Sequence, residues 1–336
     1  LTLMSRLDPD DAVLDDVVAA LRSAPAVIVT APPGSGKTTR VPPALLDAGV
    51  APGKVLLLQP RRAAARMVAR RIAWERGGAV GQEVGYAVRF DKKVSGATRL
   101  EVLTEGLLNR RIQADPFLEG VGVVVLDEVH ERSIHTDLAL ALVAEVQREA
   151  RDDLKLVVMS ATLDPGPLQR FLGEGTRVVH AEGRTYPVDV GFDERPDERR
   201  LGARVAGAVR KALSAEAEGH VLAFLPGVKE IAWTAEALGA VAGVEVLPLH
   251  GRLSAKEQDR ALAPSERRKV VLSTNLAETS VTLDGVRAVV DSGLARVPVY
   301  DAATGLTRLE TQPISRASAD QRAGRAGRTG PGRCHR

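Results

Sequence analysis

The sequence predicts an α/β protein of two domains, each built on a mainly parallel sheet. Short, apolar, β-branched runs alternate with longer stretches in which apolar residues recur at helical spacing. This alternation pauses near residues 183–188 and then begins again. At 336 residues the chain is long enough for two domains of ordinary size, each with its own core. We expect helices on both faces of each sheet, because the strand runs are apolar on both sides.

The first domain is assigned to residues 1–184 and contains five candidate strands. They are the runs 27–30, 55–58, 100–104, 121–127 and 156–160. Helical spacing is clear at 62–75 and 136–150. Strands that alternate with helices in this way indicate parallel pairing, because parallel neighbours need a long crossover connection.

The second domain is assigned to residues 185–336 and repeats the pattern. A helix at 201–217 precedes a strand at 221–225 and a helix after Gly227. Further strands are expected at 244–249, 269–273 and 286–291. Residues 296–312 differ, because alternating residues flank the turn-forming Ala-Thr-Gly at 303–305. They predict a β-hairpin that projects from this domain.

Composition places the chain among soluble globular proteins, with 44% hydrophobic and 26% charged residues. It has no run of eighteen apolar residues and no N-terminal signal pattern, so we expect no membrane span and a cytoplasmic location. The single cysteine, Cys334, excludes a disulfide framework and a cysteine metal cluster. The formal charge of +3 is too small to indicate a polyanionic partner by itself. The abrupt ends suggest a piece of a longer protein.

The segment 31–38, Ala-Pro-Pro-Gly-Ser-Gly-Lys-Thr, lies between a predicted strand and a helical stretch. Its glycines let backbone N–H groups turn towards phosphate oxygens, and the helix N-terminus adds a favourable dipole. Lys37 would reach the β- and γ-phosphates, and Thr38 would offer its hydroxyl to Mg²⁺. The usual pattern begins with Gly where this chain has Ala31, and a small residue suffices there. The candidate nucleotide-binding residues are Pro33, Gly34, Ser35, Gly36, Lys37, Thr38 and Thr39.

An acidic pair, Asp127 and Glu128, follows a buried strand, at the sheet edge where ligands bind in open α/β folds. Asp127, Glu128 and Thr38 are the candidate Mg²⁺ ligands, and Glu128 would also orient and deprotonate an attacking water. Alone, such a pair is often only a favourable charge at a helix N-terminus. Beside a phosphate loop it indicates hydrolysis of a nucleoside triphosphate. His130 either couples this site to the other domain or caps local structure.

Three arginines, Arg322, Arg325 and Arg328, recur at three-residue spacing, which on a helix gathers them on one side. Without acidic neighbours such a helix needs an anionic partner, either a γ-phosphoryl group or RNA. If these arginines reach the phosphate loop, they do so across an interface between two domains. Nucleotide binding would then close the domains.

Polar and basic residues at strand ends are the candidate nucleic-acid contacts. They are Arg61, Arg62, Thr104, Thr274 and Asn275. Strand ends and helix N-termini suit a phosphate backbone, and aromatics at 3% cannot build an extensive base-stacking platform. Plain surface charge is the alternative for each arginine.

Together these segments resemble the DEAH-box RNA helicases of helicase superfamily 2, most closely the bacterial HrpB subgroup. The matching segments are Gly-Ser-Gly-Lys-Thr at 34–38, Gln-Pro-Arg-Arg at 59–62, Thr-Glu-Gly at 104–106, Asp-Glu-Val-His-Glu-Arg at 127–132, Ser-Ala-Thr at 160–162, Phe-Leu-Pro-Gly at 224–227, Ser-Thr-Asn-Leu-Ala-Glu-Thr-Ser-Val-Thr at 273–282 and Gln-Arg-Ala-Gly-Arg-Ala-Gly-Arg at 321–328. The residues at 291–297 and 306–311 indicate the HrpB subgroup.

The resemblance implies two RecA-like, P-loop NTPase domains, with ATP or another NTP and Mg²⁺ between them and single-stranded RNA across both. By the same resemblance, Arg325 and Arg328 are arginine fingers and Gln321 contacts the γ-phosphate or water. Ser280 and Asp284 sense nucleotide, and Arg71 stacks on the base opposite Leu294. The hairpin separates strands. Movement from 3′ to 5′ and a monomeric state are expected.

Two departures from the family pattern stand out. Val129 replaces the family's Ala, which is tolerated if its side chain faces apolar neighbours. The accessory domains that follow the last motif in relatives are absent, so this piece should hydrolyse NTP while unwinding poorly.

A DNA-directed translocase and a nucleotide-dependent RNA-binding switch without processive unwinding are the alternative functions.

Overall fold

The computed structural model describes residues 11–32, 35–161, 164–181, 186–193, 199–216, 218–278 and 283–336. The chain divides into two compact units, Leu1–Gly183 and Arg184–Arg336. Each unit has its own mainly parallel sheet, so the predicted α/β class with two tandem domains is confirmed. None of the helices among the described residues is both long and apolar enough to cross a membrane.

The first unit contains an eight-stranded sheet in the order β4-β3-β5-β2-β6-β7-β1-β8. All neighbouring strands pair in parallel except β3 and β4. The strands are β1 (Ala26–Thr30), β2 (Lys54–Gln59), β3 (Val84–Val88), β4 (Asp91–Lys93), β5 (Leu100–Thr104), β6 (Val121–Leu126), β7 (Lys155–Ser160) and β8 (Arg177–His180). The helices are α1 (Asp11–Ser23), α2 (Lys37–Asp47), α3 (Arg62–Glu75), α4 (Glu105–Ala114), α5 (Ile134–Glu149) and α6 (Pro165–Leu172), with a short 3-10 turn η1 (Val129–Glu131).

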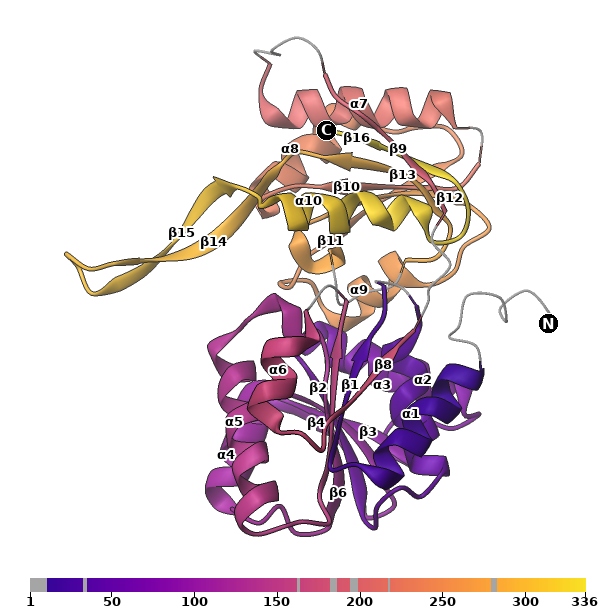
Figure 1. Ribbon diagram of the computed structural model, residues 1–336. Helices are drawn as coiled ribbons and strands as arrows, with labels where there is room; N and C mark the ends of the chain where they lie inside the picture. Colours follow the sequence, from indigo (N-terminus) through magenta and orange to yellow (C-terminus); the bar gives the residue numbers. More distant parts are fainter. Residues whose placement is uncertain are drawn as a thin grey trace. The chain divides into compact units, whose positions relative to one another are not determined.

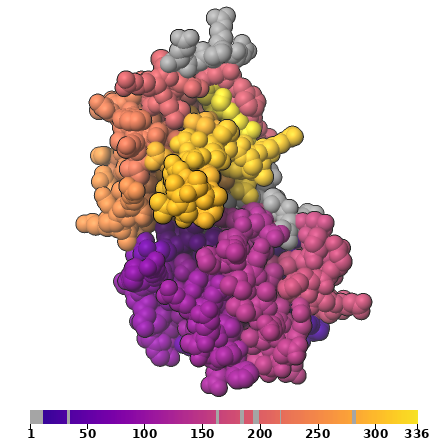
Figure 2. Space-filling view, turned by 90° about the vertical axis from the view of Figure 1, so that its left-hand side faces the viewer, coloured from indigo at the N-terminus to yellow at the C-terminus, as the bar shows by residue number. Residues whose placement is uncertain are grey.

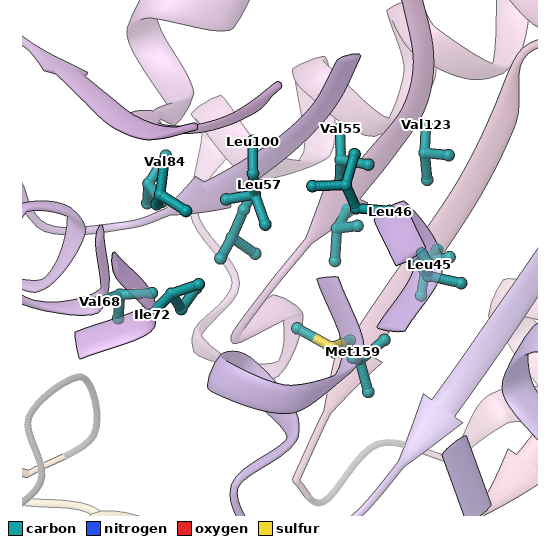
Figure 3. Close-up of a cluster of buried hydrophobic side chains, with 14 of the residues drawn as sticks. Leu45, Leu46, Val55, Leu57, Val68, Ile72, Val84, Leu100, Val123 and Met159 are labelled. Carbon is teal, nitrogen blue, oxygen red and sulfur yellow. The ribbon is translucent and has the colours of Figure 1, made fainter. Parts of the chain in front are cut away.

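The helices of this unit cover both faces of its sheet (Figure 1). Helices α1, α2 and α3 pack on one face, and α4, α5 and α6 pack on the other. Successive strand residues alternate between the two cores, so Leu57 joins the first and Leu56 the second. Figure 3 shows the first core, where Leu45 of α2 and Ile72 of α3 lie against strand residues. Each fully buried Val, Ile or Leu stabilises the fold by roughly 1.5–3 kcal/mol.

The second unit contains a six-stranded, fully parallel sheet in the order β11-β12-β10-β13-β16-β9. Its strands are β9 (Val188–Gly191), β10 (His220–Phe224), β11 (Val244–Leu249), β12 (Arg268–Ser273), β13 (Val286–Asp291) and β16 (Gly332–His335). Its helices are α7 (Leu201–Ala215), α8 (Val228–Leu238), α9 (Ala255–Leu262) and α10 (Arg316–Ala323), with 3-10 turns η2 (Asn275–Ala277) and η3 (Gly324–Gly327). Helices α7 and α8 pack against the sheet through an aliphatic core.

The hairpin expected at 296–312 is present as β14 (Leu294–Asp301) and β15 (Leu306–Pro313). The two strands pair antiparallel over their whole length and form a sheet of their own. Every residue of β15 is exposed, and the hairpin extends away from the rest of the second unit (Figure 1). Figure 2 looks at the molecule from the hairpin side and shows the hairpin in gold, pointing towards the viewer.

Candidate nucleotide site

Three of the predicted motifs follow neighbouring strands of the first sheet. Strand β7 lies between β6 and β1, so the residues after these three strands meet at one sheet edge. The backbone N–H of Ala31, which follows β1, donates to the carbonyl of Ser160 at the end of β7, with 3.0 Å between the two atoms. The phosphate-loop candidate, the acidic pair and the Ser-Ala-Thr segment therefore share one location, although Thr162 lies outside the described residues.

The phosphate-loop candidate leads into helix α2, which begins at Lys37. Gly36 precedes it with φ of +77°, a left-handed conformation that glycine adopts without steric cost. Lys37 is only 3% exposed, and it lies beside the acidic pair, where its charge favours the ionised form of Asp127. Pro33 and Gly34 lie outside the described residues. Ser35 is buried, and the Thr39 hydroxyl donates to the Gly36 carbonyl across 3.2 Å.

Asp127 accepts three hydrogen bonds from three different segments. The Thr38 hydroxyl donates to Oδ2 at 2.6 Å, and the Gln59 amide donates to the same oxygen at 2.7 Å. The backbone N–H of Glu128 donates to Oδ1 at 2.9 Å. Burial, and then the nearby charge of Glu128, raise the pKa of Asp127, while Lys37 and the two side-chain donors oppose this rise. The carboxylate is thus fixed in position but costly to ionise in the absence of a cation.

Glu128 has a left-handed backbone with φ of 55°, which costs about 1–3 kcal/mol for a residue with a side chain. Its Oε2 lies 3.3 Å from Nε2 of His130. The Nδ1 atom of His130 accepts the backbone N–H of Ala161 at 3.2 Å, which leaves the ring proton on Nε2, facing Glu128. His130 therefore lies between Glu128 and the segment after β7.

The residues at this edge fit Mg²⁺. A buried aspartate and a threonine hydroxyl lie in direct contact, and a second carboxylate raises the aspartate's pKa. Mg²⁺ is commonly held by one or two carboxylates together with waters and the phosphates of a substrate. A cation here would relieve the repulsion between Asp127 and Glu128.

In the second unit, the arginine segment differs from the expected helix. Helix α10 ends at Ala323, and the chain continues as the 3-10 turn η3, which begins and ends with glycine, a residue that weakens an α-helix. The expectation that the arginines lack acidic neighbours is wrong for Arg322, which pairs with Glu278 and Asp291. Arg325 is 2% exposed, and its Nε donates to the carbonyl of Glu278 at 3.1 Å. Gln321 and Arg328 are half-buried.

The candidate nucleic-acid residues lie at the ends of strands, as expected. Arg61 and Arg62 begin α3, and Arg61 pairs with Glu131 at 3.3 Å. Thr104 precedes α4, while Thr274 precedes η2 and accepts the N–H of Leu276. Asn275 is the first residue of η2.

The residues predicted to contact the base or to sense nucleotide lie in three separate segments. Arg71, on α3, pairs with Glu75 and lies 5.3 Å from the ring centre of Trp74. Asp284 is exposed, and Ser280 lies outside the described residues. Leu294 begins β14, and its carbonyl accepts a hydrogen bond from Arg322.

Two buried polar residues escaped the sequence reasoning. Gln59 begins the Gln-Pro-Arg-Arg segment, and its amide donates to Asp127. Its position at the end of β2, the strand beside β6, is the signal that could have revealed this contact. Glu105 is 7% exposed and accepts hydrogen bonds from Ser133 and Thr136 at the start of α5. Its position directly after the end of a buried strand, between Thr104 and Gly106, was the available clue.

A parallel α/β unit in which a Gly-Lys-Thr helix start contacts an Asp-Glu pair defines the P-loop class of nucleotide-binding proteins. Residues 13–171 match the family model described as DEAD/DEAH box helicase, and residues 205–330 match the model described as helicase conserved C-terminal domain. The two models together account for most of the chain. It belongs to the DEAD/DEAH box helicases.

Similar proteins extend this assignment. The chain is 51% identical over 328 residues to the ATP-dependent RNA helicase HrpB of Escherichia coli strain K12, covering 96% of this chain and 40% of that protein. A crystal structure of the Escherichia coli DEAH/RHA helicase HrpB matches with a TM-score of 0.91 at 49% identity, over 97% of this chain and 42% of that one. A structure of the E. coli DExH-box NTPase HrpB gives a TM-score of 0.83 at 49% identity, over 100% and 42% of the two chains. The chain thus spans about two fifths of the length of these relatives.

Val129, which replaces the family's Ala, is 3% exposed and packs in the second core of the first unit. Its neighbours there are aliphatic, which is the condition under which the larger side chain was expected to be tolerated.

Proposed function

We propose that this chain is the ATP-hydrolysing core of an RNA helicase that is stimulated by single-stranded RNA. The contact of Thr38 and Gln59 with the buried Asp127 carries the proposal, because it places a metal-binding carboxylate at the start of a phosphate-binding helix. The similarity to an ATP-dependent RNA helicase and to a DExH-box NTPase supports it.

Within the first unit, each side chain has a distinct task. Lys37 and the first backbone N–H groups of α2 bind the phosphates. Asp127 and Thr38 hold Mg²⁺, which neutralises charge on the phosphate oxygens when bound. Glu128 takes a proton from the attacking water on Oε1, since Oε2 lies 3.3 Å from Nε2 of His130. His130 keeps the glutamate oriented.

The second unit would supply the arginines. Arg325 and Arg328 stabilise the charge that develops on the γ-phosphoryl group, and Gln321 orients the water or the γ-phosphate. These residues belong to Arg184–Arg336, whereas the phosphate-binding and acidic residues belong to Leu1–Gly183. In this proposal the nucleotide is bound between the two units, and hydrolysis reopens them.

Single-stranded RNA is the proposed track, with movement from 3′ to 5′. The candidate contacts are basic and polar residues at strand ends, which suit a phosphate backbone and read little base sequence. In this scheme the exposed β14–β15 hairpin separates strands ahead of the motor.

Steady-state turnover of Mg²⁺-ATP tests the proposal. We expect turnover to rise on addition of single-stranded RNA and to rise less with DNA of the same sequence. Equal stimulation by DNA would favour a DNA-directed translocase. If ATP strengthens the binding of RNA but is not hydrolysed, a nucleotide-dependent switch would be favoured.

A variant at the proposed base sharpens this test. Glu128→Gln keeps the side-chain shape and removes the proton acceptor, so turnover should fall by about 100-fold or more while ATP still binds. The exposed Glu149→Gln, at the end of α5 in the same unit, is the matched control and should turn over normally. Near-normal turnover in Glu128→Gln would show that another group acts as the base.

A further inference from the structure

Arg322 and Arg325 are the largest side chains that are fully buried among the described residues. Arginine is rarely buried, because removing its charge from water is costly unless partners compensate. The two arginines are three residues apart, and only Arg325 is assigned a task in hydrolysis. The burial of Arg322 therefore calls for a separate explanation.

Arg322 makes contacts with four different segments of the second unit. Its Nε donates to Oε2 of Glu278 at 2.8 Å, and its Nη1 donates to Oδ1 of Asp291 at 2.8 Å. The same Nη1 donates to the carbonyl of Leu294 at 3.2 Å. Its guanidinium carbon lies 4.9 Å from the ring centre of Phe224, at the end of β10. The planar guanidinium group of arginine, whose N–H donors form a fork, is needed to reach all of these partners at once.

Glu278 connects the two buried arginines. Its carboxylate accepts from Arg322 and, at 2.5 Å, from the hydroxyl of Ser318 on α10. Its backbone carbonyl accepts from Nε of Arg325 at 3.1 Å. The hydrogen bond from Arg322 therefore helps to hold Glu278 in position, and Glu278 in turn holds Arg325.

The other partners of Arg322 are equally fixed. Oδ1 of Asp291 also accepts the N–H of Gly293 at 3.0 Å, which holds the turn leading into β14. Among the described residues, Nη2 of Arg322 and Oδ2 of Asp291 are buried without a hydrogen-bond partner. A buried ion pair with unsatisfied atoms is a poor way to gain stability, so a role in fixing geometry is the better account.

We propose that Arg322 is a positioning residue that holds Arg325, through Glu278, in the geometry required for hydrolysis. The proposal rests on the role proposed above for Arg325. Arg322 itself does not contact the nucleotide. A lysine in its place would keep the positive charge but lose the fork, so it could not hold Glu278 and Asp291 together.

The test compares Arg322→Lys with wild type in steady-state ATP hydrolysis with RNA. A displacement of about 1 Å at a catalytic group can cost about 100-fold in rate, so we expect kcat to fall by about that factor and KM for ATP to stay within about twofold. Arg260→Lys is the matched control, because Arg260 pairs with Glu245 on the surface of the same unit, and it should leave kcat unchanged. An unchanged kcat in Arg322→Lys would overturn the proposal.

A double-mutant cycle separates positioning from general damage. If Arg322 acts through Arg325, the double variant Arg322→Lys/Arg325→Ala should be no slower than Arg325→Ala alone. Multiplied losses would overturn the positioning role while leaving that of Arg325 intact. Full activity in Arg325→Ala would instead overturn the proposed function of Arg325. If Arg322→Lys does not fold, Glu278→Gln replaces it in the same cycle, because it weakens the grip of Arg322 and keeps the carbonyl that holds Arg325.

Discussion

Asp127 shows how much a single side chain can organise at the residue scale. Its carboxylate joins the start of α2, the end of β2 and the strained turn after β6 through three hydrogen bonds. The acidic pair and the phosphate loop were predictable, because residue type and position after a strand identify them. The contact with Gln59 was not, since it depends on β2 lying next to β6, and strand order is a property of the folded sheet.

The role of Gln59 leads to a prediction about both stability and metal affinity. Gln59 is 1% exposed, and Gln59→Ala removes one donor from a carboxylate that is itself 2% exposed. Leaving a buried acceptor less satisfied should lower the free energy of unfolding by about 1–3 kcal/mol. The same change should raise the Mg²⁺ concentration needed for half-maximal turnover, because Asp127 is less well held.

Urea denaturation and a Mg²⁺ titration of ATP turnover measure the two effects. Gln82→Ala serves as the control, because Gln82 is exposed and its side chain accepts the N–H of Ala79, away from the acidic pair. If Gln59→Ala binds RNA more weakly but responds to Mg²⁺ as wild type does, the side chain belongs to the nucleic-acid surface and not to the nucleotide site.

At the scale of elements, the strands in the middle of each sheet were predictable, and most of those near the edges were not. Strand β5 and helix α3 have the predicted bounds, because continuous apolar runs and helical spacing define them locally. Strands β3, β4, β8, β9 and β16 were missed, since each is short and most are mixed in polarity. Strands β8, β9 and β16 form because they pair with strands that are distant in the sequence, which local sequence patterns do not reveal. The arginine segment is not the single helix that was expected, because α10 ends at Ala323 and the glycines at 324 and 327 favour a 3-10 turn.

Strand β16 offers a test of such a pairing through the single cysteine of the chain. Cys334 is 2% exposed because β16 lies between β13 and β9. Burial, together with the charge of Asp291, raises the pKa of its thiol to about 11. At pH 8 the folded protein should therefore react with a thiol reagent far more slowly than the urea-unfolded protein, since the thiolate is the reactive form.

The same pKa gives a stability change at alkaline pH. An exposed cysteine ionises near pH 8.5, so above that value the unfolded chain gains a thiolate that the folded chain cannot hold until about pH 11. Stability should be fully present below about pH 8.5 and should fall by about 2–3 kcal/mol as the pH approaches 11. Cys334→Ser should lack this dependence on pH. Rapid labelling of folded protein at pH 8 would show that β16 does not occupy the sheet.

At the scale of the whole molecule, the two units carry complementary parts of one proposed reaction. The first holds Lys37 and the acidic pair, and the second holds the arginines and the hairpin. Neither set is sufficient for rapid hydrolysis under this proposal, because the arginines act only on a nucleotide that the first unit has bound. This proposed division of tasks follows from the order of motifs along the chain.

This division predicts that nucleotide compacts the molecule only when both sets are intact. In the slow variant Glu128→Gln, saturating Mg²⁺-ATP should reduce the radius of gyration measured by small-angle X-ray scattering. Adding Lys37→Ala should abolish the change by preventing binding, and adding Arg325→Ala should abolish it while ATP still binds, because the second unit then lacks its contact with the γ-phosphoryl group. ADP should leave the radius near that of the free protein. A radius that ATP does not change in Glu128→Gln, under conditions where binding is verified by calorimetry, would show that hydrolysis in this chain does not require closure of the two units.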